Sequence, residues 1–185
     1  MNQRTRTLTL MGLGVTLNIV GAFIALQLRL PIYLDSIGTI LIACLLGPKY
    51  AVLTGVCGSI VSGITFDIYS LYFAPVQIST GFFTGIMYQK GFLKGKRTLF
   101  GVFVLTLPTS IISAIIAAFL FGGVTSSGSS YVVQILRQIG IPSVLSVFTT
   151  QIMTDYMDKL IAVVLVSVGI TALPQSMKQT LKSKR

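Results

Sequence analysis

The stretch Leu30–Thr65 constrains the fold more than any other part of the sequence. It opens with a polar turn that holds Tyr33, Asp35 and Ser36, runs apolar to a turn at Gly47–Lys49, and then runs apolar again. This pattern predicts two membrane helices in a tight hairpin, with the acid at one face of the bilayer and the lysine at the other. Two short helices cannot shield Asp35 from lipid, so the hairpin must pack inside a larger helix bundle.

The composition extends this conclusion to the whole chain. Of its 185 residues, 53% are hydrophobic and 10% are charged, and the mean hydropathy is +0.87. Ordinary soluble domains carry more charge than this. We therefore expect a multi-pass protein of the cell membrane, with residues 1–185 forming a single membrane domain. The first apolar stretch is too long for a cleavable signal peptide.

The lengths of the apolar stretches predict an all-α bundle of six membrane-spanning helices, because a span needs about 20 residues. The second stretch is short, so its helix either begins near Ile32 or lies beneath a cavity that thins the apolar layer. Residues 131–153 fit either an outer helix or the beginning of the last span. The predicted helices are residues 7–28, 32–47, 50–65, 72–89, 99–121 and 143–173.

The charges predict the orientation of the bundle. With six spans and both termini in the cytoplasm, three of the 14 basic residues lie outside, namely Arg29, Arg137 and Lys159. That distribution follows the positive-inside rule, so the net charge of +10 reflects membrane topology and does not indicate a nucleic-acid partner. The sequence contains no histidine, no glutamate and no CxxC motif, which argues against a metal site and against a hydrolytic enzyme.

All four acids fall on the predicted outer side, and this asymmetry predicts a lidded outward pocket for a small molecule. Two alternatives are that the acids are solvated residues at the interface and that the tyrosines form an aromatic belt. Asp155 and Lys159 are four residues apart and can pair on one helix face. The candidate substrate-binding residues are Tyr33, Asp35, Ser36, Asp67, Tyr69, Tyr72, Gln77, Tyr131, Arg137, Gln151, Asp155 and Lys159.

Other polar and small residues predict helix packing. Asn18 is the strongest polar group of the first span, and we expect it to hydrogen-bond a neighbouring helix. Small residues recur every four positions in Gly55–Gly63 and in Gly81–Gly85. Such spacing is typical of faces where two helices approach closely.

Three stretches, Leu30–Gly55, Leu71–Gly85 and Asp158–Pro174, resemble the S component of energy-coupling factor (ECF) vitamin transporters. This resemblance implies a subunit that binds a vitamin from outside with high affinity. It also implies partners, namely a transmembrane T subunit, on which the S component topples in the membrane, and two ATP-binding subunits. The chain itself would be no enzyme and would need no cofactor.

The resemblance also implies a docking surface on the first helix. The family docks on the T subunit through two small residues four positions apart, which here corresponds to Gly21 and Ala25, with Gly14 as an alternative.

For the ligand, the Tyr33–Thr39 stretch resembles most closely the branch that includes the cobalamin-specific component. A ligand as large as cobalamin would suit the long polar loop at residues 122–131. Pantothenate is the alternative, because its carboxylate could pair with Arg29, Arg137 or Lys159. A stand-alone membrane carrier and a structural membrane protein without a ligand are further alternatives.

Overall fold

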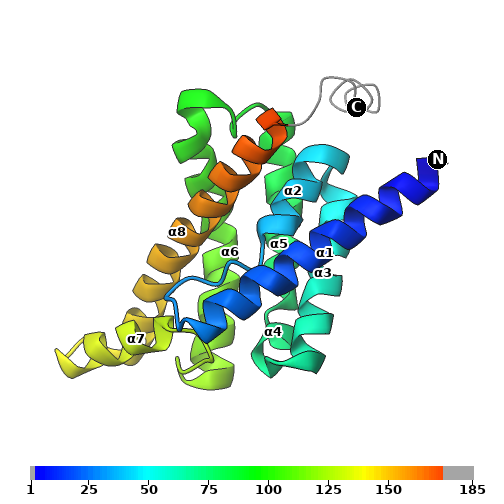
Figure 1. Cartoon of the computed structure of the whole chain (residues 1–185). Coiled ribbons are helices and arrows are strands. Elements are labelled where there is room, and N and C mark those ends of the chain that lie inside the picture. Colours follow the sequence, from blue (N-terminus) through cyan, green and yellow to red (C-terminus); the bar gives the residue numbers. More distant parts are fainter. Residues whose placement is uncertain (1–2, 173–185) are drawn as a thin grey trace.

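The computed structural model describes residues 3–172 and contains helices but no strand in that range, which confirms the predicted all-α class (Figure 1). The elements are α1 (Gln3–Gln27), α2 (Ile37–Leu46), α3 (Pro48–Thr65), α4 (Ile68–Tyr72), α5 (Ala74–Gln89), the 3-10 turn η1 (Gly95–Arg97), α6 (Thr98–Phe121), α7 (Ser129–Gln138) and α8 (Ser143–Ala172).

The short helix α2 lies at the centre of the molecule. It contacts α1, α3, α5 and α8, and six of its ten residues are buried. Because other helices surround it, α2 does not need to match the thickness of a bilayer. It begins at Ile37, so the alternative start near Ile32 is wrong, and residues 28–36 form a loop instead.

Glycine and proline determine several helix ends. Gly47 has a φ of 92°, a conformation that a side chain would strain, and Pro48 follows it at the first position of α3. These two residues produce the predicted turn between α2 and α3. Pro75 occupies the first turn of α5 in the same way, and Gly122 ends α6 with a φ of 57°.

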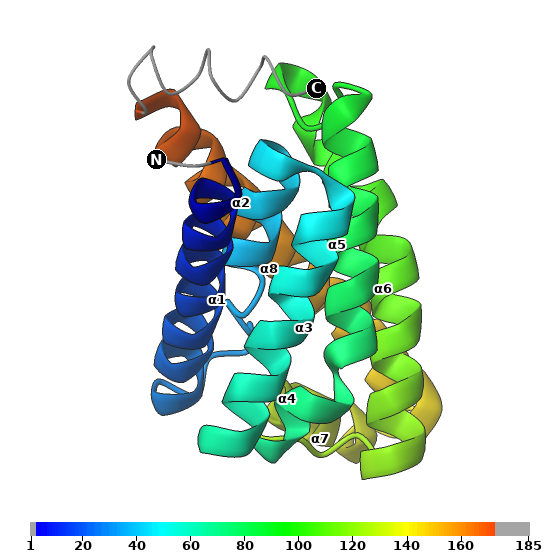
Figure 2. The same ribbon diagram turned by 90° about the vertical axis from the view of Figure 1, so that its right-hand side faces the viewer.

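Glycine also allows the close helix contacts. A Cβ added to Gly38 in α2 would collide with the carbonyl oxygen of Gly14 in α1. In the same way, Gly81 and Gly85 of α5 face the backbone of α3 at Ala51 and Pro48. The close packing predicted for Gly81–Gly85 is therefore confirmed for α5 against α3, and α6 runs on the other side of α5 (Figure 2).

Two regions differ from their predicted boundaries. The expected helix 72–89 is divided at Phe73 into the end of α4 and the longer α5. The expected loop at residues 122–130 ends earlier, because α7 begins at Ser129 and forms a separate short helix. α8 then runs unbroken from Ser143, so an outer helix precedes the last long helix.

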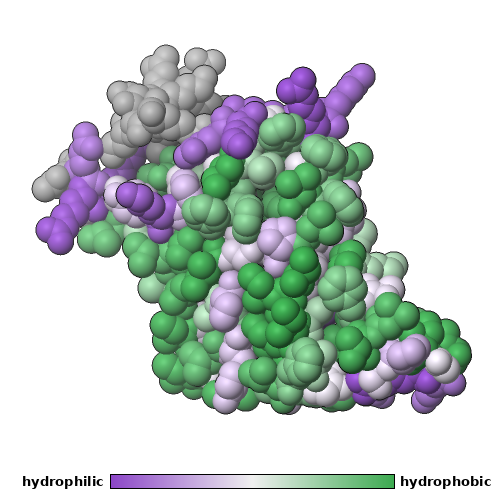
Figure 3. Space-filling model, turned by 180° about the vertical axis from the view of Figure 1, so that it is seen from behind, coloured by the Kyte–Doolittle hydropathy of each residue, from purple (hydrophilic) through white to green (hydrophobic). Residues whose placement is uncertain are grey.

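The surface has the character of a membrane protein. Large apolar side chains are exposed on the outer faces of α1, α3, α6 and α8, including Val20, Ile60, Phe119 and Val164. Figure 3 shows apolar side chains over the middle of the molecule and polar ones toward its ends. Within residues 3–172, two segments are long and apolar enough to cross a membrane by themselves, Gln3–Gln27 and Gly95–Phe121. The predicted count of six spans stays a prediction.

Candidate functional site

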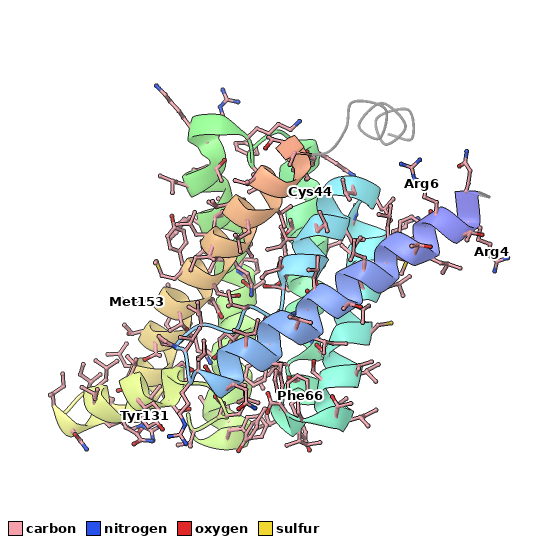
Figure 4. The ribbon with its side chains drawn as sticks, viewed as in Figure 1. Arg4, Arg6, Cys44, Phe66, Tyr131 and Met153 are labelled. Carbon is pink, nitrogen blue, oxygen red and sulfur yellow. The ribbon has the colours of Figure 1, made fainter. Side chains whose placement is uncertain are left out.

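The site lies at the end of the molecule formed by α4, α7 and the loop 28–36. Phe66 and Tyr131 mark this end, whereas Arg4 and Arg6 mark the opposite one (Figure 4). The two ends therefore differ in charge as the sequence predicts, since all four acids gather near the first and the basic N-terminal residues lie at the second.

A buried charged group holds the loop 28–36 onto α8. One carboxylate oxygen of Asp158 accepts the backbone N–H groups of Tyr33 and Leu34, at 3.2 and 2.7 Å. The other accepts the Ser36 hydroxyl at 3.2 Å and the Lys159 ammonium at 2.8 Å. Lys159 also donates to Ser36 Oγ at 3.0 Å. We call this group of Asp158, Lys159, Ser36 and the two loop amides the loop clamp.

The loop clamp corrects one prediction. Lys159 forms its ion pair with Asp158, the adjacent residue, and not with Asp155. Asp155 instead accepts the hydroxyl of Ser110 in α6 at 3.0 Å. A buried ion pair is favourable only when further hydrogen bonds satisfy its remaining atoms, and the loop supplies these to Asp158. The spacing of residues along α8 alone could not reveal which aspartate pairs with Lys159.

A second set of contacts surrounds the loop clamp. The Tyr33 hydroxyl donates to Gln151 Oε1 at 3.0 Å and lies 3.2 Å from the Ser129 hydroxyl at the start of α7. Burial raises the pKa of the Tyr33 hydroxyl above its ordinary value. Burial also raises the pKa of the Asp35 carboxyl, and the Lys159 ammonium offsets only part of that rise. The loop is thus joined by hydrogen bonds to α7 and α8.

A cavity, which we call the outer cavity, lies beneath this loop. The space open to the centre of a water molecule is about 40 Å³, enough for a few waters and too small for a vitamin. A vitamin would fit this cavity only if the segments that line it moved apart. The lining residues are Tyr33, Asp35, Asp67, Tyr69, Ser70, Phe73, Val76, Ser113, Thr125, Ser126, Asp155 and Lys159.

A larger groove of about 1020 Å³ lies at the opposite end, between the start of α1 and the turn that joins α2 to α3. It is open, and Arg4 is the one charged residue among those that line it. Because it lacks the acids and most of the tyrosines, it is not the site that the sequence predicts.

A separate polar network joins the helices below the outer cavity. Asn18 Nδ2 donates to Thr39 Oγ1 at 2.8 Å, and Asn18 Oδ1 accepts the Gly38 N–H at 2.7 Å. Thr39 donates to Gln77 Oε1 at 2.9 Å, and Gln77 Nε2 donates to the Asp35 carbonyl at 3.1 Å. We call this network the helix junction. It confirms the predicted role of Asn18.

The structure separates the predicted binding residues into two groups. Those around the outer cavity and the loop clamp are Tyr33, Asp35, Ser36, Asp67, Tyr69, Gln151, Asp155 and Lys159. Four others lie elsewhere. Gln77 belongs to the helix junction, and Tyr72 packs edge-on against Phe121 with its side chain exposed. Tyr131 is exposed and accepts a hydrogen bond from Arg29, and Arg137 donates to the Gly122 carbonyl.

Ser110 and Ser113 lie at the candidate site but were not among the predicted binding residues. Both lie on the buried face of α6, where Ser110 bonds Asp155 and Ser113 lines the outer cavity. The available signal was two serines about one helical turn apart in a helix that also carries three threonines. That signal also fits simple helix packing, so it could not identify the site without its partners on α8.

The three residues predicted to dock a T subunit face the interior of the chain. Gly14, Gly21 and Ala25 are buried. A Cβ on Gly14 would meet Ile42 and Thr54, and one on Gly21 would collide with the Leu34 carbonyl. In this structure, these small residues let α1 lie close to α2, α3 and the loop 28–36. Their docking role stays a prediction.

Comparison with protein-family models identifies the chain. Residues 6–179 match the model of the ECF transporter, substrate-specific component. The chain belongs to this family. As an ECF substrate-specific component, it is a membrane protein that binds a substrate for transport, and the ATPase activity belongs to partner subunits. Comparisons of this ECF component with curated proteins and with solved structures gave no significant match.

Proposed function

We propose that this ECF component captures a vitamin or related small molecule at the outer cavity and passes it to an ECF module for import. The observation that carries the proposal is the cavity itself, which lies under the loop 28–36 and brings together residues from α5, α6, α8 and the segment before α7. Family membership supplies the transport role, and the cavity supplies a place for the substrate.

The proposed cycle uses the loop 28–36 as the cover of the site. Asp158 and Lys159 hold the loop closed through a few hydrogen bonds to its backbone and to Ser36. Opening the cover would expose the acids and aromatic side chains to the outside, and closure over the ligand would exclude water. A T subunit and two ATP-binding subunits would supply the work of release to the inside.

We further propose the topology that such a cycle needs. The chain would cross the plasma membrane six times as one membrane domain, with both termini in the cytoplasm and the outer cavity facing outward. The basic residues near the N-terminus and in the segment around η1, opposite the acidic end, support this orientation.

Cobalamin stays the first candidate ligand from sequence resemblance, and pantothenate the second. The amide N–H groups of cobalamin would suit carboxylate acceptors, but its size requires the cover to open widely, since the closed cavity holds only a few waters. For pantothenate, two of the three predicted carboxylate partners are engaged outside the cavity: Arg29 with Tyr131 and Arg137 with Gly122. The third, Lys159, is paired with Asp158.

Co-purification and uptake test this function. The tagged full-length chain is purified from membranes that also express the T and ATP-binding subunits, and ATP-dependent uptake of labelled vitamins is measured in proteoliposomes. We expect a stable complex and uptake that stops when the ATPase is inactivated. Uptake by the chain without its partners would favour a stand-alone carrier. A folded chain that neither binds the module nor supports uptake would contradict the proposal.

A further inference from the structure

The outer cavity is strongly acidic in a strongly basic protein. The chain has a net charge of +10 and only four acids, yet Asp35, Asp67 and Asp155 all line this one cavity. Lys159 is the one cation in the lining, and it is already bound to Asp158 at 2.8 Å and to Ser36 at 3.0 Å. The lining therefore holds three carboxyl groups and one ammonium, and the ion pair of that ammonium is with Asp158 rather than with any of the three.

A buried hydroxyl gives an independent indication of a ligand. Ser113 is 1% exposed and lines the cavity, but among the described residues it has no hydrogen-bond partner. Buried polar groups are normally satisfied, so an unpaired hydroxyl that faces a cavity indicates a place for water or for a ligand group. Ser110, one turn earlier in α6, is by contrast engaged with Asp155.

Three aromatic side chains, Tyr33, Tyr69 and Phe73, also line the cavity, and Phe121 packs behind two of them. Tyr33 and Phe73 lie with ring centroids 6.4 Å apart, and Phe73 stacks on Phe121 at 6.3 Å with 16° between the ring planes. Tyr69 packs edge-on against the same Phe121. Aromatic faces attract organic cations, and carboxylates attract them as well. Both features of this lining therefore favour a positively charged organic ligand.

We infer that the outer cavity selects a small organic cation, a ligand that carries a positively charged nitrogen next to a flat ring and has no free carboxylate. The charged nitrogen lies among Asp35, Asp67 and Asp155, the ring lies against Tyr33 and Phe73, and a polar substituent reaches Ser113. This inference rests on the proposed function, since it describes the substrate of the same site. It disfavours pantothenate, whose carboxylate would meet the three acids, and it also displaces cobalamin, which is not a small organic cation, as the first candidate ligand.

A matched series of ligands tests the charge preference. Native mass spectrometry and equilibrium dialysis of the full chain would compare pyridoxamine, pyridoxine and 4-pyridoxate, which share one ring and carry an amine, a hydroxyl or a carboxylate. Thiamine, a permanent cation, and pantothenate and cobalamin complete the panel. We expect at least one cationic member to bind, and to bind about tenfold or more tightly than its neutral or acidic counterpart.

Substitutions in the lining test whether the preference for a cation arises at the outer cavity. Asp35→Asn and Asp155→Asn keep the side-chain volume and remove one charge each, and each should reduce the preference for the cation about tenfold while the protein stays monodisperse and folded. Thr149→Val, at an exposed position of α8, is the control and should change nothing. Ser113→Ala should weaken binding of the polar-substituted ligands without changing the charge preference.

Several outcomes would overturn the inference. These are tighter binding of a carboxylate than of its cationic counterpart, a cation preference that survives both Asp variants, or no binding of any cationic member. Suppose that no cationic ligand binds, but a neutral or acidic vitamin does and the complex with the ECF module still forms. The proposed function then stands, and only the charge preference is wrong. If neither binding nor the complex is seen, the proposed function fails as well.

Discussion

The helix junction and the loop clamp are two polar groups in the same apolar chain, and they are built differently. The junction uses neutral amides and hydroxyls between helices that glycines bring close together, as at Gly14 and Gly38. The clamp uses a buried ion pair, Asp158 with Lys159, to hold backbone amides of a loop. The first fixes helices against each other, whereas the second fixes a segment that must move if a ligand is to enter.

The largest expected effect comes from breaking the loop clamp. Asp158→Ala leaves Lys159 buried without its charge partner and removes the acceptor of two loop amides, which should lower the free energy of unfolding by about 3–5 kcal/mol. Denaturant unfolding in detergent measures this effect. The double variant Asp158→Leu with Lys159→Met should recover much of the loss, because it removes both charges. A loss below about 1 kcal/mol for the single variant would show that the clamp is weak.

Overpacking the helix junction should have the next largest effect. Gly38→Ala places a Cβ against the Gly14 carbonyl, and forcing the two helices apart should cost about 1–3 kcal/mol. Gly12→Ala is the matched control, since a Cβ there meets no atom within 4 Å and should leave stability equal or slightly higher. Thermal unfolding of both variants measures the difference. Equal melting temperatures would contradict the close crossing of α1 and α2.

Removing the amide of the junction should have a smaller effect. Asn18→Ala deletes the hydrogen bonds to Thr39 and Gly38, and polar contacts between membrane helices are worth about 1 kcal/mol. If the helix junction and the loop clamp act separately, this variant lowers global stability while hydrogen exchange in the loop 28–36 stays unchanged. Faster exchange confined to the loop would show that the two regions are coupled.

The smallest effect is expected from Tyr33→Phe. It removes the hydroxyl contacts to Gln151 and Ser129 but keeps the ring, so stability should fall by about 1 kcal/mol or less. Hydrogen exchange should nevertheless become faster in the loop 28–36. Tyr72→Phe, at an exposed ring on α4, is the control and should leave the loop unchanged. Unchanged exchange in Tyr33→Phe would mean that the Tyr33 hydroxyl does not help to hold the loop.

The sequence predicted those parts of the fold that local residues determine. The helix expected at 50–65 is Pro48–Thr65, and those expected at 99–121 and 143–173 are Thr98–Phe121 and Ser143–Ala172 in the described range. Pro48, Gly122 and Pro142 lie at or next to three of these ends, where they favour a boundary whatever the tertiary packing is. Leu173 lies outside the described residues.

The predictions that were wrong concern features that depend on contacts between segments far apart in the sequence. The late start of α2 follows from Asp158 accepting the amide of Leu34, which lies 124 residues away in the chain. The same contact explains why Lys159 pairs with its neighbour in sequence and not with Asp155. The gathering of the acids at one end was predicted, because topology alone determines it, but their arrangement around a closed cavity was not.

The distance along the chain between the two halves of the loop clamp has a consequence for biogenesis. The loop 28–36 leaves the ribosome long before α8 does, because its partners in the clamp lie 122 to 125 residues later. Until α8 is inserted, the amides of Tyr33 and Leu34 lack this acceptor, and the outer cavity lacks one wall. A chain truncated before residue 158 therefore cannot form the loop clamp. Insertion of the last helix is therefore the step that completes the loop clamp and the outer cavity, and an incomplete subunit keeps these loop amides unpaired with α8.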